Sequence, residues 1–278
     1  MKTGEALQGL RKILSGIGPM VVGFSAGADS TLLLKVAHDV LGEGVAGVTT
    51  VSPTLPGAER EEAGRLAREI GARHRFVPSG EMGDPQFLAN SSRRCYFCRS
   101  DLFRILREEA RALGFGAIAY GAQRDDLGEF RPGMEAAREY GARAPLLEAG
   151  LGKAEIRDLS RFLGLPTWDK PALACLSSRI PHGTPITLED LGRVERAEAA
   201  VRSEGFRLFR VRTRGADARL EIAREEMGRL EDGRLRERLL RRVLEIGYST
   251  VLIDPEGYRP GGGAAFGIAA GDGVEKRG

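Results

Sequence analysis

Residues 21–30 bring small residues, hydroxyl groups and one acid together where an apolar run changes into a helix-forming stretch. Gly27 and its small neighbours let backbone N–H groups approach an anion closely. Ser25 and Ser30 add hydroxyl donors, and the following helix presents the positive end of its dipole. Asp29 would repel a bare phosphate, so its presence predicts a bridging cation such as Mg²⁺. We therefore expect phosphate chemistry here; an ordinary capped strand-to-helix turn is the alternative.

The three cysteines form a second motif, with Cys95 and Cys98 as C-x-x-C and Cys175 much later in the chain. In a cytosolic chain this spacing indicates a metal or redox site more often than a structural disulfide. A closed zinc site needs four ligands, whereas three thiolates fit an iron–sulfur cluster with one iron open to a ligand such as sulfide. Three unrelated buried thiols are the alternative. The neighbouring arginines, which favour thiolates, are Arg93, Arg94, Arg99 and Arg179.

Up to about residue 170, apolar runs alternate with helical patterns, which predicts an α/β fold with a doubly wound parallel sheet. The expected strands are 20–24, 45–51, 74–77 and 117–120, and the expected helices include 58–70 and 101–113. Ligands of such sheets bind at the carboxyl ends of the strands. Residues 25–30, 50–53 and 121–126 would all lie at that edge.

Beyond residue 186 the pattern predicts a smaller C-terminal α+β domain. Its expected elements are a helix at 188–203, strands at 207–212 and 218–223, one long Arg/Glu-rich helix at 225–246 and a strand at 249–253. We predict domains at 1–185 and 186–260. The glycine-rich tail at 261–278 is expected to be disordered and has no assigned role.

The composition is that of a globular protein, with 278 residues and 42% hydrophobic content. The longest apolar runs fall short of the roughly 20 residues that a membrane helix needs, and the N-terminus lacks a signal-peptide core. We therefore expect a cytoplasmic protein without membrane contact. A net charge of +3 with mostly arginine cations is better explained by genomic bias than by a nucleic-acid surface.

Seven short segments together resemble the LarE-type ATP-dependent sulfur transferases of the PP-loop ATP pyrophosphatase superfamily. They are 23–30 (GFSAGADS), 90–98 (NSSRRCYFC), 121–126 (GAQRDD), 131–133 (RPG), 170–179 (KPALACLSSR), 210–212 (RVR) and 257–259 (GYR). Neither a Walker A loop nor G-x-G-x-x-G occurs at residues 21–30. Ala26 departs from the family's S-G-G-x-D-S pattern. If that position needs a positive φ, alanine costs on the order of 1 kcal/mol.

The resemblance implies that ATP adenylates a carboxylate of pyridinium-3,5-biscarboxylic acid mononucleotide and that sulfur then replaces the activated oxygen. The thiocarboxylate product leads to the nickel-pincer nucleotide of lactate racemase and related enzymes. The implied partners are this small-molecule substrate, sulfide or another sulfur donor, and further copies of the chain in a homo-oligomer, which is a hexamer in family members.

The family contains two schemes of sulfur delivery. Members with only the equivalent of Cys175 sacrifice its sulfur and keep dehydroalanine. Members with all three cysteines, as here, are thought to bind a 4Fe-4S cluster whose free iron carries sulfide. The resemblance therefore favours a cluster on Cys95, Cys98 and Cys175. Cys175 as the donor, with the other two as a resolving or zinc pair, stays open.

The chemistry assigns further roles. Asp29 is expected to hold Mg²⁺ together with Asp125 or Asp126; a helix cap and solvated turn are the alternative for the pair. Arg210 and Arg212 alternate along a strand, so one face could grip the phosphate of the mononucleotide, with surface salt bridges as the alternative. The expected nucleotide contacts are Phe24, Ser25, Gly27, Ser30 and Gly121. The expected catalytic residues are Cys175, Asp29 and Arg179, the last guiding an anionic substrate to the sulfur donor.

Two other functions stay open. A tRNA thiolase of the same superfamily also joins a PP-loop to three cysteines, but it needs a basic surface with exposed aromatics, and only 6% of the residues are aromatic. A non-catalytic nucleotide- or metal-binding module is the second, left open by Ala26. Retardation of tRNA supports the first, and failure to release pyrophosphate supports the second.

Overall fold

The computed structural model describes residues 3–127, 132–171, 174–259 and 275–276. The chain divides into two compact units, Met1–Phe87 with Arg93–Leu173 and Leu88–Ser92 with Ala174–Gly278. By this division, residues 174–185 group with the second unit. The domain bounds expected from the sequence stay predictions.

The first unit contains a four-stranded sheet in the order β3-β2-β1-β4. All neighbouring strands are parallel; Val21, for example, pairs with Ala46 and with Ile118. The strands are β1 (Met20–Gly23), β2 (Val45–Val51), β3 (Arg73–Pro78) and β4 (Ala117–Ala119). The predicted α/β fold with a parallel sheet is confirmed.

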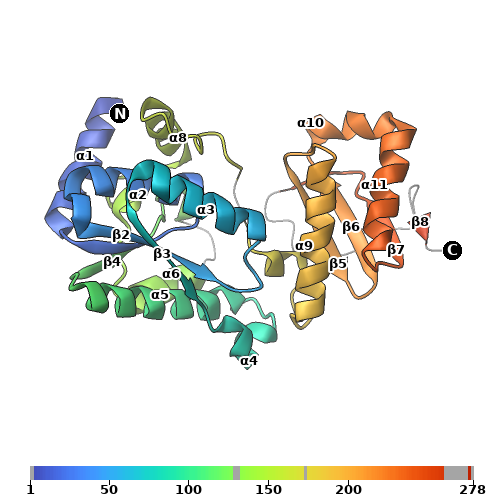
Figure 1. Ribbon diagram of the computed structural model, residues 1–278, viewed down its shortest axis with the longest axis horizontal. Helices are drawn as coiled ribbons and strands as arrows, with labels where there is room; N and C mark the ends of the chain where they lie inside the picture. The colour runs from blue at the N-terminus through green and yellow to red at the C-terminus, as the bar shows by residue number, and fades with distance from the viewer. Residues whose placement is uncertain (1–2, 128–131, 172–173, 260–274, 277–278) are drawn as a thin grey trace. The chain divides into compact units, whose positions relative to one another are not determined.

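Helices cover both faces of this sheet (Figure 1). Successive residues of β1 point to opposite faces: Val22 packs in the core beneath α1, α2 and α8, whereas Val21 packs beneath α5 and α6. The longer helices are α1 (Thr3–Ile17), α2 (Ala28–Leu41), α3 (Gly57–Ile70), α5 (Arg94–Leu113), α6 (Pro132–Glu139) and α8 (Lys153–Phe162). The shorter ones are η1 (Gly42–Gly44), η2 (Glu81–Gly83), α4 (Pro85–Leu88), η3 (Arg124–Asp126) and α7 (Pro145–Glu148).

Helix α5 begins at Arg94, seven residues before the start expected from the sequence. The added turns continue the apolar face of the helix, because Tyr96 packs against the same core as Phe103 and Leu106. Cys95 and Cys98 therefore lie in the first two turns of a helix and not in a loop before it.

The second unit contains a four-stranded sheet in the order β5-β6-β7-β8. β5 (Phe209–Arg214) and β6 (Asp217–Ile222) are antiparallel, and β7 (Thr250–Ile253) is parallel to β6. The short β8 (Glu275–Lys276) pairs with β7, whereas the composition of this tail predicted disorder. Residues 260–274 and 277–278 lie outside the described part of the chain.

Helices α9 (Leu188–Ser203) and α11 (Gly233–Glu245) bury one face of this sheet. The single helix expected at 225–246 is wrong: α10 (Arg224–Met227), η5 (Gly228–Glu231) and α11 replace it. Asp232 ends the first part and caps α11, since its Oδ1 accepts the N–H groups of Arg234 and Leu235 at 2.9 and 3.4 Å. Aspartate is one of the preferred N-cap residues of helices.

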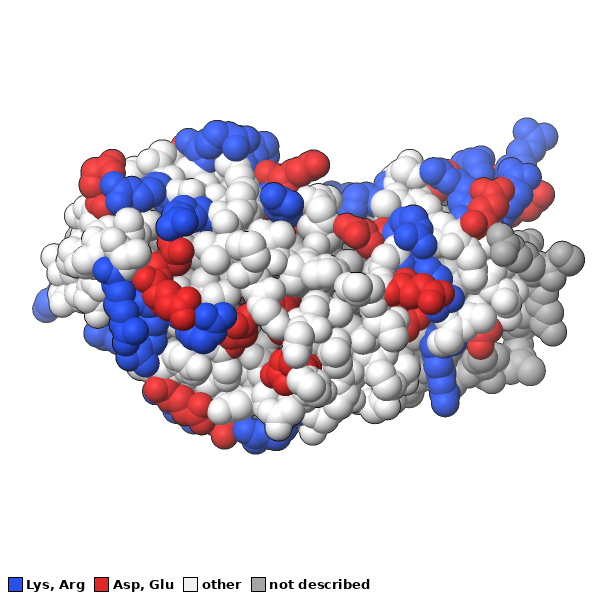
Figure 2. All heavy atoms as spheres, turned by 60° about the horizontal axis from the view of Figure 1, so that its bottom comes forward, with Lys and Arg blue, Asp and Glu red and all other residues white. Residues whose placement is uncertain are grey.

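Among the described residues, no helix combines the length and the apolar character that crossing a membrane requires. On the face drawn in Figure 2, acidic and basic side chains of the described residues lie next to one another, without one continuous basic area. This mixed pattern is unlike the basic stripe of a nucleic-acid surface.

Candidate functional site

The predicted phosphate loop connects β1 to α2. Its two serines lie together, with the Ser25 and Ser30 hydroxyl oxygens 3.1 Å apart. Ser30 Oγ accepts the N–H of Ser25 at 3.2 Å and donates to the carbonyl oxygen of Gly27 at 3.3 Å. Gly27 is the N-cap of α2 and offers no side-chain cap. The first amides of a 14-residue helix are therefore not capped by a side chain of the N-cap residue, as an anion site requires.

Ala26 adopts a left-handed backbone conformation, the positive φ considered for this position in the sequence. Its φ is 56°, and it is completely buried. Lys170 Nζ donates to the carbonyl oxygen of Ala26 at 3.1 Å and to Glu59 Oε2 at 2.9 Å. The departure from the family pattern is thus a strained residue in an otherwise matching loop.

Gly121 follows β4 and lies directly against this loop. A Cβ atom at Gly121 would stand 3.1 Å from the backbone nitrogen of Ser30 and 3.3 Å from Cβ of Asp29. The carboxyl ends of β1 and β4 therefore meet at the start of α2, as the rule for parallel sheets predicts. Gly121 is needed for this close approach, and its expected contact with a nucleotide stays a prediction.

The three aspartates expected to bind Mg²⁺ have different surroundings. Asp29 is half-buried in the first turn of α2. Asp126 Oδ2 accepts the N–H of Gln123 at 3.0 Å, and Asp125 Oδ2 accepts the N–H of Lys153 at 2.9 Å. Asp125 and Asp126 thus serve as caps, the alternative that the sequence left open. In the described part of the chain no group of three or more His, Cys, Asp or Glu is arranged to hold a metal, so the magnesium role stays a prediction.

A buried carboxylate at the same edge of the sheet was missed in the sequence. Glu81 lies in η2, 4% exposed, and its Oε1 accepts hydrogen bonds from the hydroxyls of Ser52 and Thr54. Ser52 was within the segment expected at the ligand edge, but Glu81 carries no local signal. The bond joins residues 29 positions apart, so only the fold brings them together.

His74 is on β3, which β2 separates from β1, and its ring reaches Phe24, the residue that follows β1. Its Nε2 is 2.9 Å from Thr49 Oγ1, which in turn donates to the carbonyl oxygen of Phe24 at 2.6 Å. The imidazole packs edge-on against Phe24 and Phe76. Burial lowers the pKa of His74, and the charge of Arg68 lowers it further.

Cys95 and Cys98 are one turn apart at the start of α5, the first exposed and the second half-buried. The N-cap residue Arg93 gives no side-chain cap to this helix. Helix α6 packs against this turn: Glu135 accepts from Arg93 Nη2 at 3.1 Å, and Tyr96 donates to Glu139 at 2.7 Å. Gly133 also approaches this turn closely, and Arg131 of the same motif lies outside the described residues.

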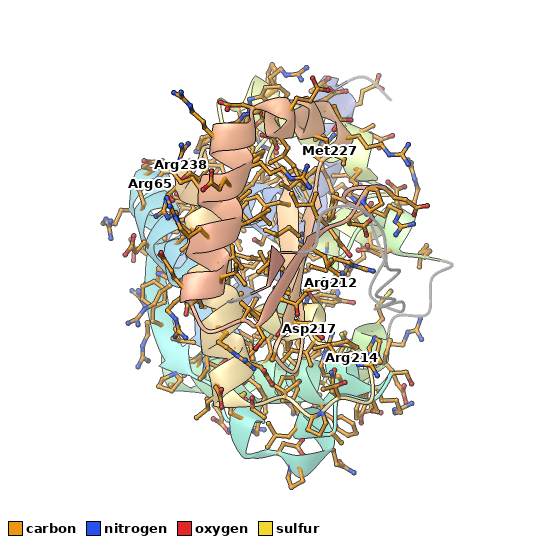
Figure 3. All side chains as sticks on the ribbon, turned by 90° about the vertical axis from the view of Figure 1, so that its right-hand side faces the viewer. Arg65, Arg212, Arg214, Asp217, Met227 and Arg238 are labelled. Carbon is orange, nitrogen blue, oxygen red and sulfur yellow. The ribbon has the colours of Figure 1, made fainter. Side chains whose placement is uncertain are left out.

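Arginines line the face of the second sheet that α9 and α11 leave uncovered. Figure 3 shows Arg212 and Arg214 on β5 and Asp217 at the start of β6. Arg210 and Arg212 share one face, as predicted from their alternation. Arg212 Nε donates to Glu221 Oε1 at 2.7 Å, and its Nη1 donates to the carbonyl oxygen of Ser178 at 3.0 Å.

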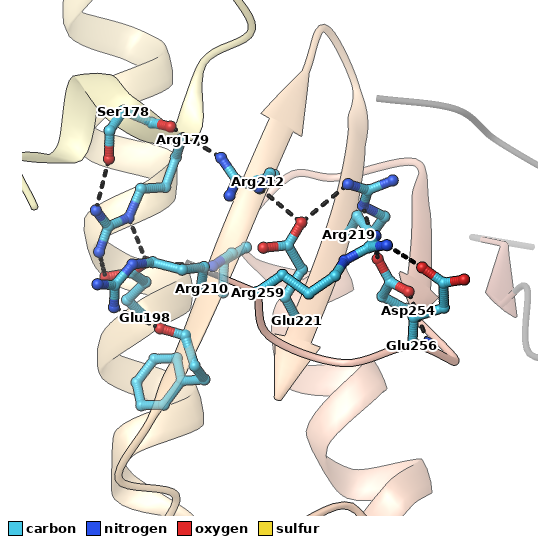
Figure 4. Close-up of polar contacts among 12 residues, drawn as sticks. Ser178, Arg179, Glu198, Arg210, Arg212, Arg219, Glu221, Asp254, Glu256 and Arg259 are labelled. Carbon is cyan, nitrogen blue, oxygen red and sulfur yellow. Dashed lines mark hydrogen bonds and ion pairs between the residues drawn. The ribbon is translucent and has the colours of Figure 1, made fainter. Parts of the chain in front are cut away.

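Buried acids partly neutralise this arginine face (Figure 4). Arg219 Nη2 donates to Glu221 Oε1 at 2.9 Å, and its Nε is 3.5 Å from Asp254 Oδ2. Arg210 lies over the ring of Tyr258 at 5.1 Å. Burial lowers the pKa of Arg210, and the charge of Arg179 contributes to the same shift. The salt bridges suggested as the alternative role therefore exist, but they are buried and not on the surface.

Cys175 belongs to the second unit, where it is the half-buried N-cap of η4 (Leu176–Arg179). Its Sγ is 2.9 Å from Ser177 Oγ. Arg179 Nη1 donates to the carbonyl oxygens of Ala174 and Cys175 at 2.8 and 3.1 Å, while Glu198 accepts from Arg179 Nε at 2.7 Å (Figure 4). The buried guanidinium thus holds the backbone of the cysteine.

The structure therefore groups the predicted residues within each unit. Ser25, Ser30 and Gly121 meet in the first unit, as do Cys95 and Cys98. In the second unit, Arg179 and Arg212 both contact Ser178. That the three cysteines share one site stays a prediction.

No protein-family model matches the chain. Comparison with curated proteins finds 34% identity over 249 residues to the pyridinium-3,5-bisthiocarboxylic acid mononucleotide synthase of Lactiplantibacillus plantarum, which covers 89% of this chain and 90% of that protein. An uncharacterised protein of Synechocystis sp. is 43% identical over 255 residues, 92% of this chain and 95% of that protein. An uncharacterised protein of Methanocaldococcus jannaschii is 28% identical over 174 residues, 63% of this chain and 67% of its own length.

Proposed function

Because this chain belongs to the LarE family of sulfur transferases, we propose that it uses ATP to convert the carboxylates of pyridinium-3,5-biscarboxylic acid mononucleotide to thiocarboxylates. The observation that carries this proposal is the serine loop at the carboxyl edge of the parallel sheet, with the uncapped start of α2 behind it. A loop of this kind binds the phosphates of a nucleotide through backbone N–H groups.

Activation by ATP solves a specific chemical problem, since a carboxylate has no good leaving group. A carboxylate oxygen attacks the α-phosphorus of ATP, and the bond to pyrophosphate breaks. The acyl carbon of the adenylate then accepts a sulfur nucleophile, and AMP leaves with the former carboxylate oxygen. Ser25, Gly27 and Ser30 would hold the pyrophosphate, and Asp29 would hold Mg²⁺, whose charge offsets that of the phosphates when it is bound.

The arginine face of the second unit supports binding of the mononucleotide's phosphate. Arg212 uses Nε and Nη1 for Glu221 and Ser178, and its Nη2 makes no hydrogen bond to any residue that the structure describes. Arg210 lies on the same face. A guanidinium held in place by acids is well suited to bind phosphate, because little rotamer entropy is lost on binding.

For the sulfur source we propose a 4Fe-4S cluster held by Cys95, Cys98 and Cys175. Support for this proposal comes from Cys95 and Cys98, which are three positions apart near the start of α5 and therefore lie on the same side of that helix. When bound, the cluster supplies a replaceable sulfide on its open iron. Transfer of the Cys175 sulfur itself is the second candidate, favoured by the hold of Arg179 on the backbone of that one cysteine.

Purified protein with ATP, Mg²⁺, sulfide and the pyridinium biscarboxylic mononucleotide tests the main proposal. We expect pyrophosphate and a product in which sulfur replaces oxygen, read by mass spectrometry. Absence of pyrophosphate with this acceptor would contradict the assignment, and retardation of tRNA in a gel would instead support a tRNA thiolase.

Anaerobic reconstitution with iron and sulfide tests the sulfur source. We expect a broad absorption band near 400 nm, a rough value for thiolate-bound clusters, which the Cys95→Ala variant loses and the Ser100→Ala variant of the same helix keeps. Whole-protein mass after turnover separates the two candidates, because loss of one sulfur atom shows that Cys175 is consumed.

The family resemblance also leads us to propose a cytoplasmic homo-oligomer, a hexamer. Size-exclusion chromatography with light scattering measures this oligomeric state.

A further inference from the structure

Lys170 ties the phosphate loop to helix α3 through two hydrogen bonds. Its ammonium donates to the carbonyl oxygen of Ala26 at 3.1 Å and to Glu59 Oε2 at 2.9 Å. The side chains of Lys170 and Glu59 are only 18% and 10% exposed. Lys170 and Ala26 are 144 residues apart in the chain, so this contact is a product of the fold and not of local sequence.

The carbonyl that Lys170 holds belongs to the peptide bond between Ala26 and Gly27, whose N–H lies at the N-cap of α2. In a trans peptide the C=O of one residue and the N–H of the next point in opposite directions, and no described peptide bond is cis. Fixing the carbonyl of Ala26 therefore also fixes the direction of the Gly27 N–H. That N–H donates to no residue that the structure describes, so it is available to an anion.

The same peptide needs such support because Ala26 has a φ of 56°. Side chains other than glycine rarely adopt this region, since Cβ crowds the backbone. The hydrogen bond to an ammonium favours the left-handed state over the relaxed one. Glu59 neutralises the charge of Lys170. The pair therefore orients the peptide after Ala26 and adds little net positive charge to the loop.

We propose that Lys170 is a positioning residue of the nucleotide site, which presets the Gly27 N–H for phosphate by holding the carbonyl of left-handed Ala26. This inference rests on the proposed use of ATP. It differs from a merely structural ion pair, which would affect the stability of the first unit and leave nucleotide binding unchanged in the folded protein.

Calorimetric titration of the full chain with a non-hydrolysable ATP analogue and Mg²⁺ tests the proposal. We expect Lys170→Met to bind the analogue about tenfold more weakly, the size expected for one lost charge-assisted hydrogen bond. Lys35→Met is the matched control, since Lys35 pairs with Asp39 on the surface of α2, and we expect its affinity to be that of the unaltered protein.

The double variant Lys170→Met with Ala26→Gly separates positioning from charge. Glycine adopts the left-handed state without strain, so we expect it to restore part of the lost affinity, whereas a lost phosphate contact would not be restored. Equal affinity of Lys170→Met and the unaltered protein overturns the inference, and so does a loss that Ala26→Gly leaves unchanged. If Lys170→Met does not fold, Lys170→Gln is used. If the unaltered protein does not bind the analogue, the proposed function itself fails.

Discussion

Arg179 and Glu198 form a doubly hydrogen-bonded ion pair inside the second unit, with Nε–Oε1 and Nη2–Oε2 distances of 2.7 and 3.0 Å. Their side chains are 3% and 7% exposed. Glu198 also accepts the N–H of Val211 on β5, while Arg179 holds the carbonyl oxygen of Cys175. The pair therefore connects the cysteine segment to the sheet, and the substrate-guiding role expected of Arg179 from the sequence stays a prediction.

We predict that Glu198→Gln destabilises the protein by about 3–5 kcal/mol, the usual cost of leaving a buried charge without its partner. Urea unfolding followed by circular dichroism measures this. The control is Arg238→Gln on α11, whose pair with Glu204 is 47% exposed on the arginine side; we expect a much smaller loss there, because solvent screens an exposed ion pair. Equal losses in the two variants would contradict the role given to the buried pair.

Gly121→Ala should disturb the phosphate loop. The added methyl group would lie 3.1 Å from the Ser30 nitrogen and 3.3 Å from the Asp29 carbonyl carbon, and backbone atoms at a helix start cannot move easily. We expect weaker binding of ATP and a stability loss of about 1–3 kcal/mol, as for other overpacked sites. Gly116→Ala, where a Cβ would meet nothing within 4 Å, is the control in thermal unfolding and ATP titration. Unchanged ATP affinity in Gly121→Ala would show that the loop tolerates the shift.

Asp29→Asn should abolish pyrophosphate release that depends on the acceptor substrate. The amide keeps the shape of the side chain but loses the charge that would hold Mg²⁺, and we expect a rate loss of about a hundredfold or more. The loss of a favourable charge at this helix start contributes about 0.3–1 kcal/mol to the change in stability. Asp39→Asn, on the far end of α2, is the matched control in a coupled pyrophosphate assay. Release at the normal rate from Asp29→Asn would remove the metal assignment.

His74 should make the stability of the protein depend on pH. Its pKa in the folded protein is lowered, mainly by burial, so below about pH 6.5, the ordinary value for histidine, the unfolded chain binds more protons. The contribution of His74 is therefore complete above about pH 6.5 and is lost as the pH falls through the lowered pKa.

Urea midpoints from about pH 7.5 to about pH 5 measure this effect. We expect His74→Gln to lose part of the decline toward low pH, whereas a variant of the exposed His182, His182→Gln, keeps it. A decline of the same size in His74→Gln and in the unaltered protein would show that other groups cause it.

The sequence alone was sufficient where the determining residues are neighbours in the chain. The apolar run at 20–23 and the small residues after it specify a strand followed by an anion-binding turn, because the periodicity and the loop chemistry are both local. The parallel sheet followed from the same kind of pattern. The break in the helix expected at 225–246 also has a local cause, because Asp232 is the N-cap of α11. The Arg/Glu-rich periodicity on both sides of it nevertheless predicted one continuous helix.

The tertiary structure alone decided which side chains support these motifs. Lys170 donates a hydrogen bond to the carbonyl oxygen of Ala26, and Glu81 accepts one from the hydroxyl of Ser52. Arg179 pairs with Glu198, which is 19 residues away in the chain. Such contacts depend on how strands and helices pack, and no spacing in the sequence records that packing. The fold also gives Arg179 its buried partners Glu198 and the carbonyl oxygen of Cys175, because a charge that is removed from water must be satisfied by partners within the fold.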